Sequence, residues 1–210
     1  MCWNEHVSIN TFLFSAFVLG LIMYNNAYTK YKIHELNNKW VYLFFASFIL
    51  MQLIEFFIWK NINNAYYNNV FSIAATCLLI LQPIASLMIL SNIPLRNILI
   101  LVYLLLTIPY SIYKFSIYHI QSVQSKCGHL QWQFLRQDTI AWCIWLFFFL
   151  FSLIYEMHWG GLIFACIVLF ICVTNYAKDR TIGSMWCWLV NSVMIYYAFY
   201  LLLYLPFQEG

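Results

Sequence analysis

Residues 40–59 read WVYLFFASFILMQLIEFFIW, and every side chain in this stretch except Ser47, Gln52 and Glu55 is hydrophobic. A helix of about 20 apolar residues spans about 30 Å, which is the thickness of the hydrocarbon core of a bilayer. The run is too long and too continuous for a strand of a membrane β-barrel, in which apolar and polar residues alternate over about ten residues. The stretch therefore predicts a transmembrane helix that carries one carboxylate.

Six other parts of the chain have a similar length and apolar character. With 40–59 included, the predicted spans are 7–24, 40–59, 70–91, 97–116, 138–156, 159–176 and 182–205. Most connections between them are short, and the fifth and sixth spans are joined so tightly that they must form a hairpin. The longest connection between the later spans is 117–137, which is either an interfacial helix or an ordered loop. We expect an all-α, polytopic membrane protein, with a single transmembrane domain over 1–210 that forms a bundle of seven transmembrane helices.

The composition agrees with lipid as the main solvent and the main partner of this chain. Of its 210 residues, 64% are hydrophobic and only 8% are charged, whereas a soluble domain has about 25% charged residues. The formal net charge of +3 is scattered along the chain. Because a nucleic-acid-binding surface needs a concentrated basic face, we expect no nucleic-acid partner.

The chain has no recognisable cofactor, metal or catalytic motif. No two of its seven cysteines have a Cys-x-x-Cys spacing, and none of its five histidines forms a His-x-x-x-His pair. The last span lacks a lysine at its centre, so a retinal Schiff base has nowhere to form. We therefore expect no cofactor and no metal, and the sequence gives no reason to expect an enzyme.

The charges around the spans give two indications of membrane orientation. With seven spans, the N-terminus shares one side of the membrane, here named side A, with the connections 60–69, 117–137 and 177–181. Lysines follow the first span and nothing basic precedes it, which favours an N-terminus outside the cytoplasm. The total number of Lys and Arg residues favours the opposite orientation. We adopt the first interpretation.

With this orientation, Cys2 and Cys127 both lie on the non-cytoplasmic side, where a disulfide persists once it forms. A disulfide between them is one prediction. The alternative is two unpaired thiols.

Glu55 is the acidic or basic residue that lies well inside a predicted span. Placing a carboxylate there costs about 2.5–3.5 kcal/mol on insertion scales, so such a residue usually faces the interior of a bundle or a wet cavity. Gln52 lies three residues earlier and therefore on the same face of the helix. The alternative is that Glu55 reaches the interface or pairs with Lys60.

Depth below side A brings further side chains to the level of Glu55. At about 1.5 Å per residue, Glu55 lies roughly 7 Å below the end of its span. The same count places Trp142, Asn175 and the indoles of the last span at a similar depth, and Gln82 and Asn191 deeper. The candidate site is a cavity open to side A, lined by Glu55, Gln52, Gln82, Trp142, Asn175, Trp186, Trp188 and Asn191.

An acid surrounded by indole faces suits a small cationic or amphipathic ligand or an ion, through charge and cation–π attraction. Glu55 can instead carry a proton. The alternative is structural: the Trp residues form aromatic belts, and the Gln and Asn side chains join helices by hydrogen bonds. Pro83 and Pro109 lie inside spans, and each is expected to kink its helix and to free a carbonyl that needs another partner.

Three short motifs carry a family resemblance. Met1-Cys2-Trp3 at the start, Gln52…Glu55…Trp59 in the second span and the segment 183–188 (GSMWCW) in the last resemble an uncharacterised group of small multispan membrane proteins from giant DNA viruses and their algal or protist relatives. Asn4 departs from the serine that is usual in that group. The resemblance implies a viral or algal source and a seven-helix bundle, and it implies no activity.

Three classes of function follow. The first is a channel or transporter for a small solute or ion that uses the cavity around Glu55. The second is a structural or assembly protein of a virion or of a host endomembrane, in which Glu55 serves packing. The third is a lipid-binding or lipid-modifying protein, or a receptor. An oligomer is compatible with each class.

Overall fold

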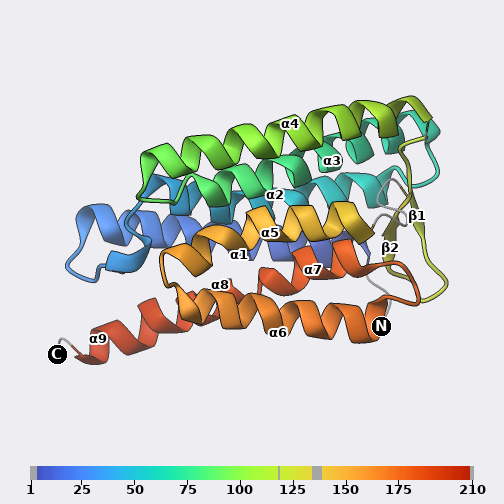
Figure 1. Ribbon diagram of the computed structural model, residues 1–210. Helices are drawn as coiled ribbons and strands as arrows, with labels where there is room; N and C mark the ends of the chain where they lie inside the picture. The colour runs from blue at the N-terminus through green and yellow to red at the C-terminus, as the bar shows by residue number, and fades with distance from the viewer. Residues whose placement is uncertain (1–3, 118, 134–138, 209–210) are drawn as a thin grey trace.

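The apolar stretches are helical in the computed structural model, which describes residues 4–117, 119–133 and 139–208. In chain order the elements are α1 (Glu5–Tyr28), the 3-10 helix η1 (His34–Leu36), α2 (Lys39–Lys60), α3 (Ala65–Leu87), α4 (Ile93–Ile117), β1 (Ser122–Gln124), β2 (Leu130–Trp132), α5 (Thr139–Tyr155), α6 (Trp159–Tyr176), α7 (Ile182–Val190), α8 (Val193–Phe199), the π-helix η3 (Tyr200–Tyr204) and α9 (Leu205–Gln208). The long helices lie side by side along one axis (Figure 1).

The helices have the length and composition of membrane spans. In the part of the chain that the structure describes, α1, α2, α3, α4, α6 and the segment Ile182–Phe207 are long and apolar enough to cross a bilayer. The seventh, α5, is apolar and has 17 residues. The predicted all-α, multi-pass architecture is therefore confirmed.

Asparagine side chains start several of the helices. Asn4, Asn38 and Asn64 each accept a hydrogen bond from a backbone N–H in the first turn of the helix that follows. Such caps satisfy amide groups that have no partner within the helix. The asparagines that separate the apolar runs in the sequence therefore determine where the helices begin.

The turn between α5 and α6 is a tight hairpin, as predicted. Met157 adopts a left-handed conformation with φ of 56°. The N–H of His158 donates to the carbonyl of Leu153 at 2.9 Å, and the N–H of Met157 donates to Ile154 at 3.2 Å. This pair of bonds is a Schellman motif, which ends a helix and reverses the chain within a few residues.

The last span differs from the prediction, because 182–205 is not one continuous α-helix. It breaks at Asn191 and Ser192, where α7 ends and α8 begins. The Asn191 side chain donates to the carbonyl of Cys187 at 2.7 Å, and the backbone bonds through the break join residues three apart, such as Met194 N–H to Asn191 O at 3.0 Å. A side chain that competes for a helix carbonyl favours such a break.

The connection 117–137 contains a β-hairpin, so the ordered-loop prediction is correct for its described part. β1 and β2 pair antiparallel, with Ser122 opposite Trp132. Asn68 of α3 anchors the hairpin, since its side chain donates to Ser122 O at 2.8 Å and accepts from Ser122 N–H at 2.9 Å. Trp132 is buried in the core. The hairpin thus covers the side A end of the bundle (Figure 1).

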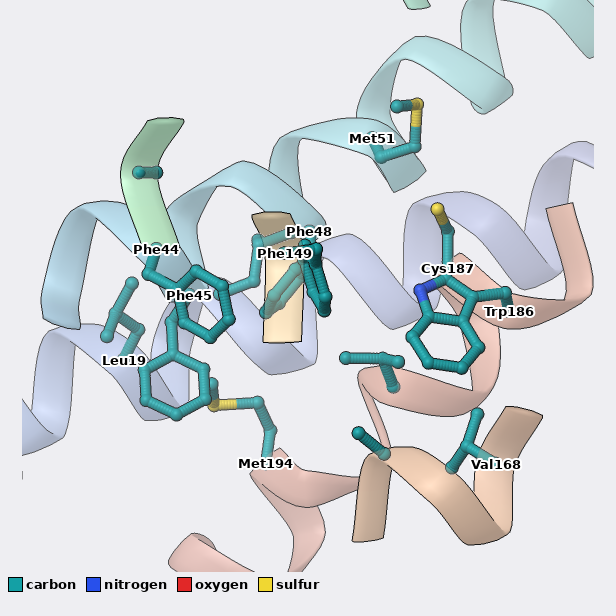
Figure 2. Close-up of a cluster of buried hydrophobic side chains, with 14 of the residues drawn as sticks. Leu19, Phe44, Phe45, Phe48, Met51, Phe149, Val168, Trp186, Cys187 and Met194 are labelled. Atoms are coloured by element: carbon teal, nitrogen blue, oxygen red, sulfur yellow. The ribbon is translucent and has the colours of Figure 1, made fainter. Parts of the chain in front are cut away.

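Aromatic rings of α2 and α5 form much of the core. Phe44 and Phe48 of α2 have ring centroids 4.6 Å apart, and Phe149 of α5 lies 5.4 Å from Phe44 and 5.7 Å from Phe48. Figure 2 shows these rings beside Trp186 of α7, which lies on the same core. α2 and α3 are the most buried spans, and α4 is the least buried.

Pro83 lies inside α3, as predicted, and its effect on the helix is compensated by two neighbours. A proline has no N–H, so the carbonyl of Leu79 four residues earlier loses its helical partner. The indole N–H of Trp145 on α5 donates to that carbonyl at 2.8 Å. The hydroxyl of Tyr103 on α4 donates to the next carbonyl, that of Ile80, at 2.9 Å. The carbonyl freed by Pro83 therefore ties α3 to α5, and the adjacent carbonyl of Ile80 ties it to α4.

We expect Trp145→Phe to lower the free energy of unfolding by about 1 kcal/mol, because it leaves the Leu79 carbonyl without a donor in the membrane. Pro83→Ala restores the N–H of residue 83 as a donor to Leu79. The loss caused by Trp145→Phe should therefore be smaller in the Pro83→Ala background. Unfolding of the purified protein in mixed micelles measures both effects. Trp142→Phe is the control, and an equal loss in this variant would show that ring size alone matters.

Candidate functional site

Glu55 lies inside the bundle on the last turns of α2. Its side chain is 2% exposed, and that of Gln52, one turn earlier, is fully buried. The amide nitrogen Nε2 of Gln52 donates to the carboxylate oxygen Oε2 of Glu55 at 3.1 Å. Glu55 therefore faces protein, and the alternative in which it reaches the interface or pairs with Lys60 is wrong.

The first turns of α7 complete the surroundings of the carboxylate. The Ser184 hydroxyl lies near the Glu55 carboxylate but forms no hydrogen bond with it. The Cys187 thiol, one turn further along α7, is fully buried and interacts with both the Glu55 carboxylate and the Gln82 amide. Figure 2 shows the Cys187 side chain extending from α7 toward the helix that carries Met51. Cys187 thus lies near both Glu55 and the deeper Gln82.

Two amides extend the cluster toward the middle of the membrane. The Gln82 side chain on α3 is fully buried and donates to Ser47 O of α2 at 3.4 Å. The Asn191 side chain, at the break between α7 and α8, is 4% exposed and donates to Phe48 O at 3.4 Å. Both bonds end on carbonyls of α2. The polar groups thus form a column along α2, from Glu55 to the centre of the span.

Several acceptors of this column have no donor. Four buried oxygens have no hydrogen-bond partner among the described residues: Oε1 of Glu55, Oε1 of Gln52, Oε1 of Gln82 and Oδ1 of Asn191. A buried polar group without a partner is unfavourable by about 1–3 kcal/mol. A proton, a cation or water is the species that satisfies such oxygens.

No cationic side chain balances the carboxylate. Among residues 4–117, 119–133 and 139–208, Glu55 forms no ion pair with a Lys, Arg or His side chain. Within the same residues, no cluster of three His, Cys, Asp or Glu side chains can hold a metal ion. The cluster therefore has the ligands of a proton or an alkali cation, namely a carboxylate and neutral oxygens.

The structure brings together only part of the set of residues predicted from the sequence. Trp186 is buried beside Phe149, whereas Trp188 is half-buried and donates to Thr11 Oγ1 at 3.1 Å. Asn175 is exposed and donates to the carbonyl of Ile171 on its own helix at 3.0 Å. Trp142 lines a separate cavity between α3, α4 and α5. Counting residues along each helix predicts that these side chains lie at the same depth in the membrane. It does not predict toward which neighbouring helix each side chain points.

Ser184 and Cys187 belong to the cluster but were not among the predicted site residues. The signal lay within the segment 183–188, where small and polar residues alternate with bulky ones. Small residues allow helices to approach closely in a membrane. The candidate site predicted from the sequence includes only the tryptophans of this segment.

The predicted pair of Cys2 and Cys127 is not tested, because Cys2 lies outside the described residues. The Cys127 thiol is 2.9 Å from the Ser125 hydroxyl in the hairpin. The disulfide stays a prediction.

The hairpin packs against two of the helices that carry the cluster. β2 packs against α7, which carries Ser184 and Cys187, and β1 packs against α3. His129, just before β2, is 8% exposed, and its ring lies 5.4 Å from the Tyr176 ring in an edge-on contact. Burial lowers the pKa of His129 from its ordinary value of 6.5, and the charge of Asp179 acts in the opposite direction.

The fold and the apolar surface define a multi-pass integral membrane protein with a buried acidic cluster. Comparison of the chain with models of protein families, with curated proteins and with solved structures gave no match.

We expect the hairpin to pack less stably below the ordinary pKa of histidine. The folded protein opposes protonation of His129, so the unfolded hairpin binds the proton more readily as the pH falls through 6.5, and stability decreases. Hydrogen exchange of residues 122–132, corrected for intrinsic rates, should be faster at about pH 5.5 than at about pH 7.5. His129→Gln should remove this difference and His34→Gln should retain it. An unchanged difference in His129→Gln would contradict the assignment.

Proposed function

We propose that this protein is a channel or transporter for a small cation, and that Glu55 binds the transported proton or alkali ion. The observation that supports the proposal most strongly is a buried carboxylate without a cationic partner among the described residues, beside three amide oxygens that lack donors. An ionised carboxylate in this position is strongly unfavourable, so the site favours binding of a proton or a cation.

The break between α7 and α8 is a second structural feature that supports the proposal. Discontinuous membrane helices expose backbone carbonyls and polar side chains at the depth where transporters bind their ions. Here the break falls at Asn191, whose side chain also contacts α2. A rotation of α7 about this point would separate Ser184 and Cys187 from Glu55 and admit water.

Flux through proteoliposomes tests the role of Glu55. Wild-type protein should carry protons or sodium ions down an imposed gradient, measured with an internal pH-sensitive dye and with radioactive sodium as separate arms. Glu55→Gln should reduce the flux to that of empty liposomes. Glutamine has nearly the same size as glutamate, but its neutral amide neither takes up a proton nor attracts a cation by charge. Glu35→Gln, which removes an exposed acid in η1, should retain full flux. Wild-type flux in Glu55→Gln, or no flux in the wild type, would reject the proposal.

Cys187 provides an independent measure of water access. Under conditions of flux, its buried thiol should react with a small charged thiol reagent, and Cys77, which lies on the exposed face of α3, should stay unreactive in lipid. Retaining one of these cysteines at a time identifies the reactive residue. A Cys187 thiol that never reacts, together with absent flux, would favour the structural role, in which Glu55 and the amides only join helices.

A further inference from the structure

A second site lies on the other side of α3 from α2, in a cavity of about 100 Å³ between α3, α4 and α5. Its lining shares no residue with the Glu55 cluster. The buried side chains of Leu79, Tyr103 and Trp145 form its floor, and half-buried residues of α4 and α5, such as Ser111 and Trp142, form its rim. The cavity is therefore reached from the outer surface of the bundle, next to the most exposed span.

The cavity has the shape of a slot parallel to the helices. At its deep end, the rings of Tyr103 on α4 and Phe148 on α5 meet at 5.2 Å and close the gap between the two helices. From Tyr103 the lining follows α4 to Lys114, near the side A end of that helix. The rise of a helix makes this length about 16 Å. The slot thus runs from the middle of the membrane to its side A interface.

The polar groups of the slot are already used by the backbone. The hydroxyls of Thr107 and Ser111 donate to carbonyls one turn earlier on α4, at 2.8 and 2.7 Å. Tyr103 and Trp145 donate to the α3 carbonyls near Pro83. The interior therefore offers hydrocarbon and aromatic contacts and few hydrogen bonds, and an apolar ligand suits it better than a polar solute.

Among the described residues that line the cavity, the charged one is Lys114, at the interfacial end. The Lys114 ammonium group lies 5.4 Å from the centre of the Tyr110 ring, and both residues line the cavity. A basic side chain at the membrane surface attracts anionic lipid headgroups. The apolar slot and the basic end together have the chemistry of an acidic amphiphile.

We propose that this slot receives part of one acyl chain of an anionic phospholipid from the side A leaflet, with the headgroup at Lys114. The neighbouring outward face of α4 is exposed along its length and has lipid as its natural surroundings. A chain entering between α4 and α5 would replace disordered lipid contacts with the fixed rings of Trp142 and Trp145.

Photolabelling tests whether the slot is occupied. A phospholipid with a diazirine in its acyl chain, incorporated into nanodiscs with the full chain, should label residues 103–114 and 141–145. Thr107→Phe and Ser111→Phe fill the slot and should each reduce that labelling about tenfold. Leu105→Phe, on the outward face of α4 where Leu105 is 65% exposed, should retain it. Labelling spread evenly over the outward face of α4, or unchanged in both filling variants, would overturn the proposal.

Native mass spectrometry tests the headgroup. The wild type should retain phosphatidylglycerol over phosphatidylcholine by about fivefold, the contribution of one basic residue at a membrane surface. Lys114→Gln should abolish this preference, whereas Lys30→Gln, on the opposite side of the membrane, should keep it. Equal retention of the two lipids by the wild type would overturn the anionic assignment, and this measurement does not depend on folding of the filling variants.

Discussion

In the hydrocarbon core of a bilayer, no water competes for hydrogen bonds, so each polar group of the chain needs a partner inside the protein. The surroundings of Pro83 show how this requirement positions helices. The carbonyl of Leu79, which loses its helical donor, receives the indole N–H of Trp145 at 2.8 Å, and the carbonyl of Ile80 receives the hydroxyl of Tyr103 at 2.9 Å. The N–H missing at Pro83 thereby sets a contact with α5, and the adjacent carbonyl of Ile80 sets one with α4.

The same requirement makes the Glu55 cluster different from the rest of the core. Near side B, Ser86 of α3 and Ser152 of α5 lie 2.6 Å apart, and the Ser86 hydroxyl lies at the same distance from the carbonyl of Phe149. In the cluster, by contrast, Glu55 and Gln52 each keep a buried oxygen without a donor among the described residues. Single buried atoms such as Ser15 Oγ and Thr181 Oγ1 also lack partners, but in the cluster four unpaired oxygens lie along one helix, an arrangement that suits a further species.

The two proposed sites lie on opposite sides of α3 and differ in polarity. Toward α2 and α7, Gln82 extends a column of polar groups that ends at Glu55. Toward α4 and α5, Tyr103 and Trp145 use their polar atoms on α3 and leave an apolar slot. Because Gln82 and Pro83 are adjacent, one short part of α3 contributes to both. A lipid in the slot and a cation in the cluster would therefore bind on either side of the same part of α3.

The sequence by itself determined the spans, because a membrane helix is specified by a length of apolar residues that needs no tertiary contact. It also predicted the tight turn after α5, the carbonyl freed by Pro83 and the burial of Glu55 with Gln52, since each depends on residues within one or two turns. The break at Asn191, the hairpin over side A and the choice of Ser184 and Cys187 over Trp142 and Asn175 came only from the tertiary structure. Depth along a helix follows from counting residues, but the direction in which a side chain points depends on how each helix is rotated against its neighbours.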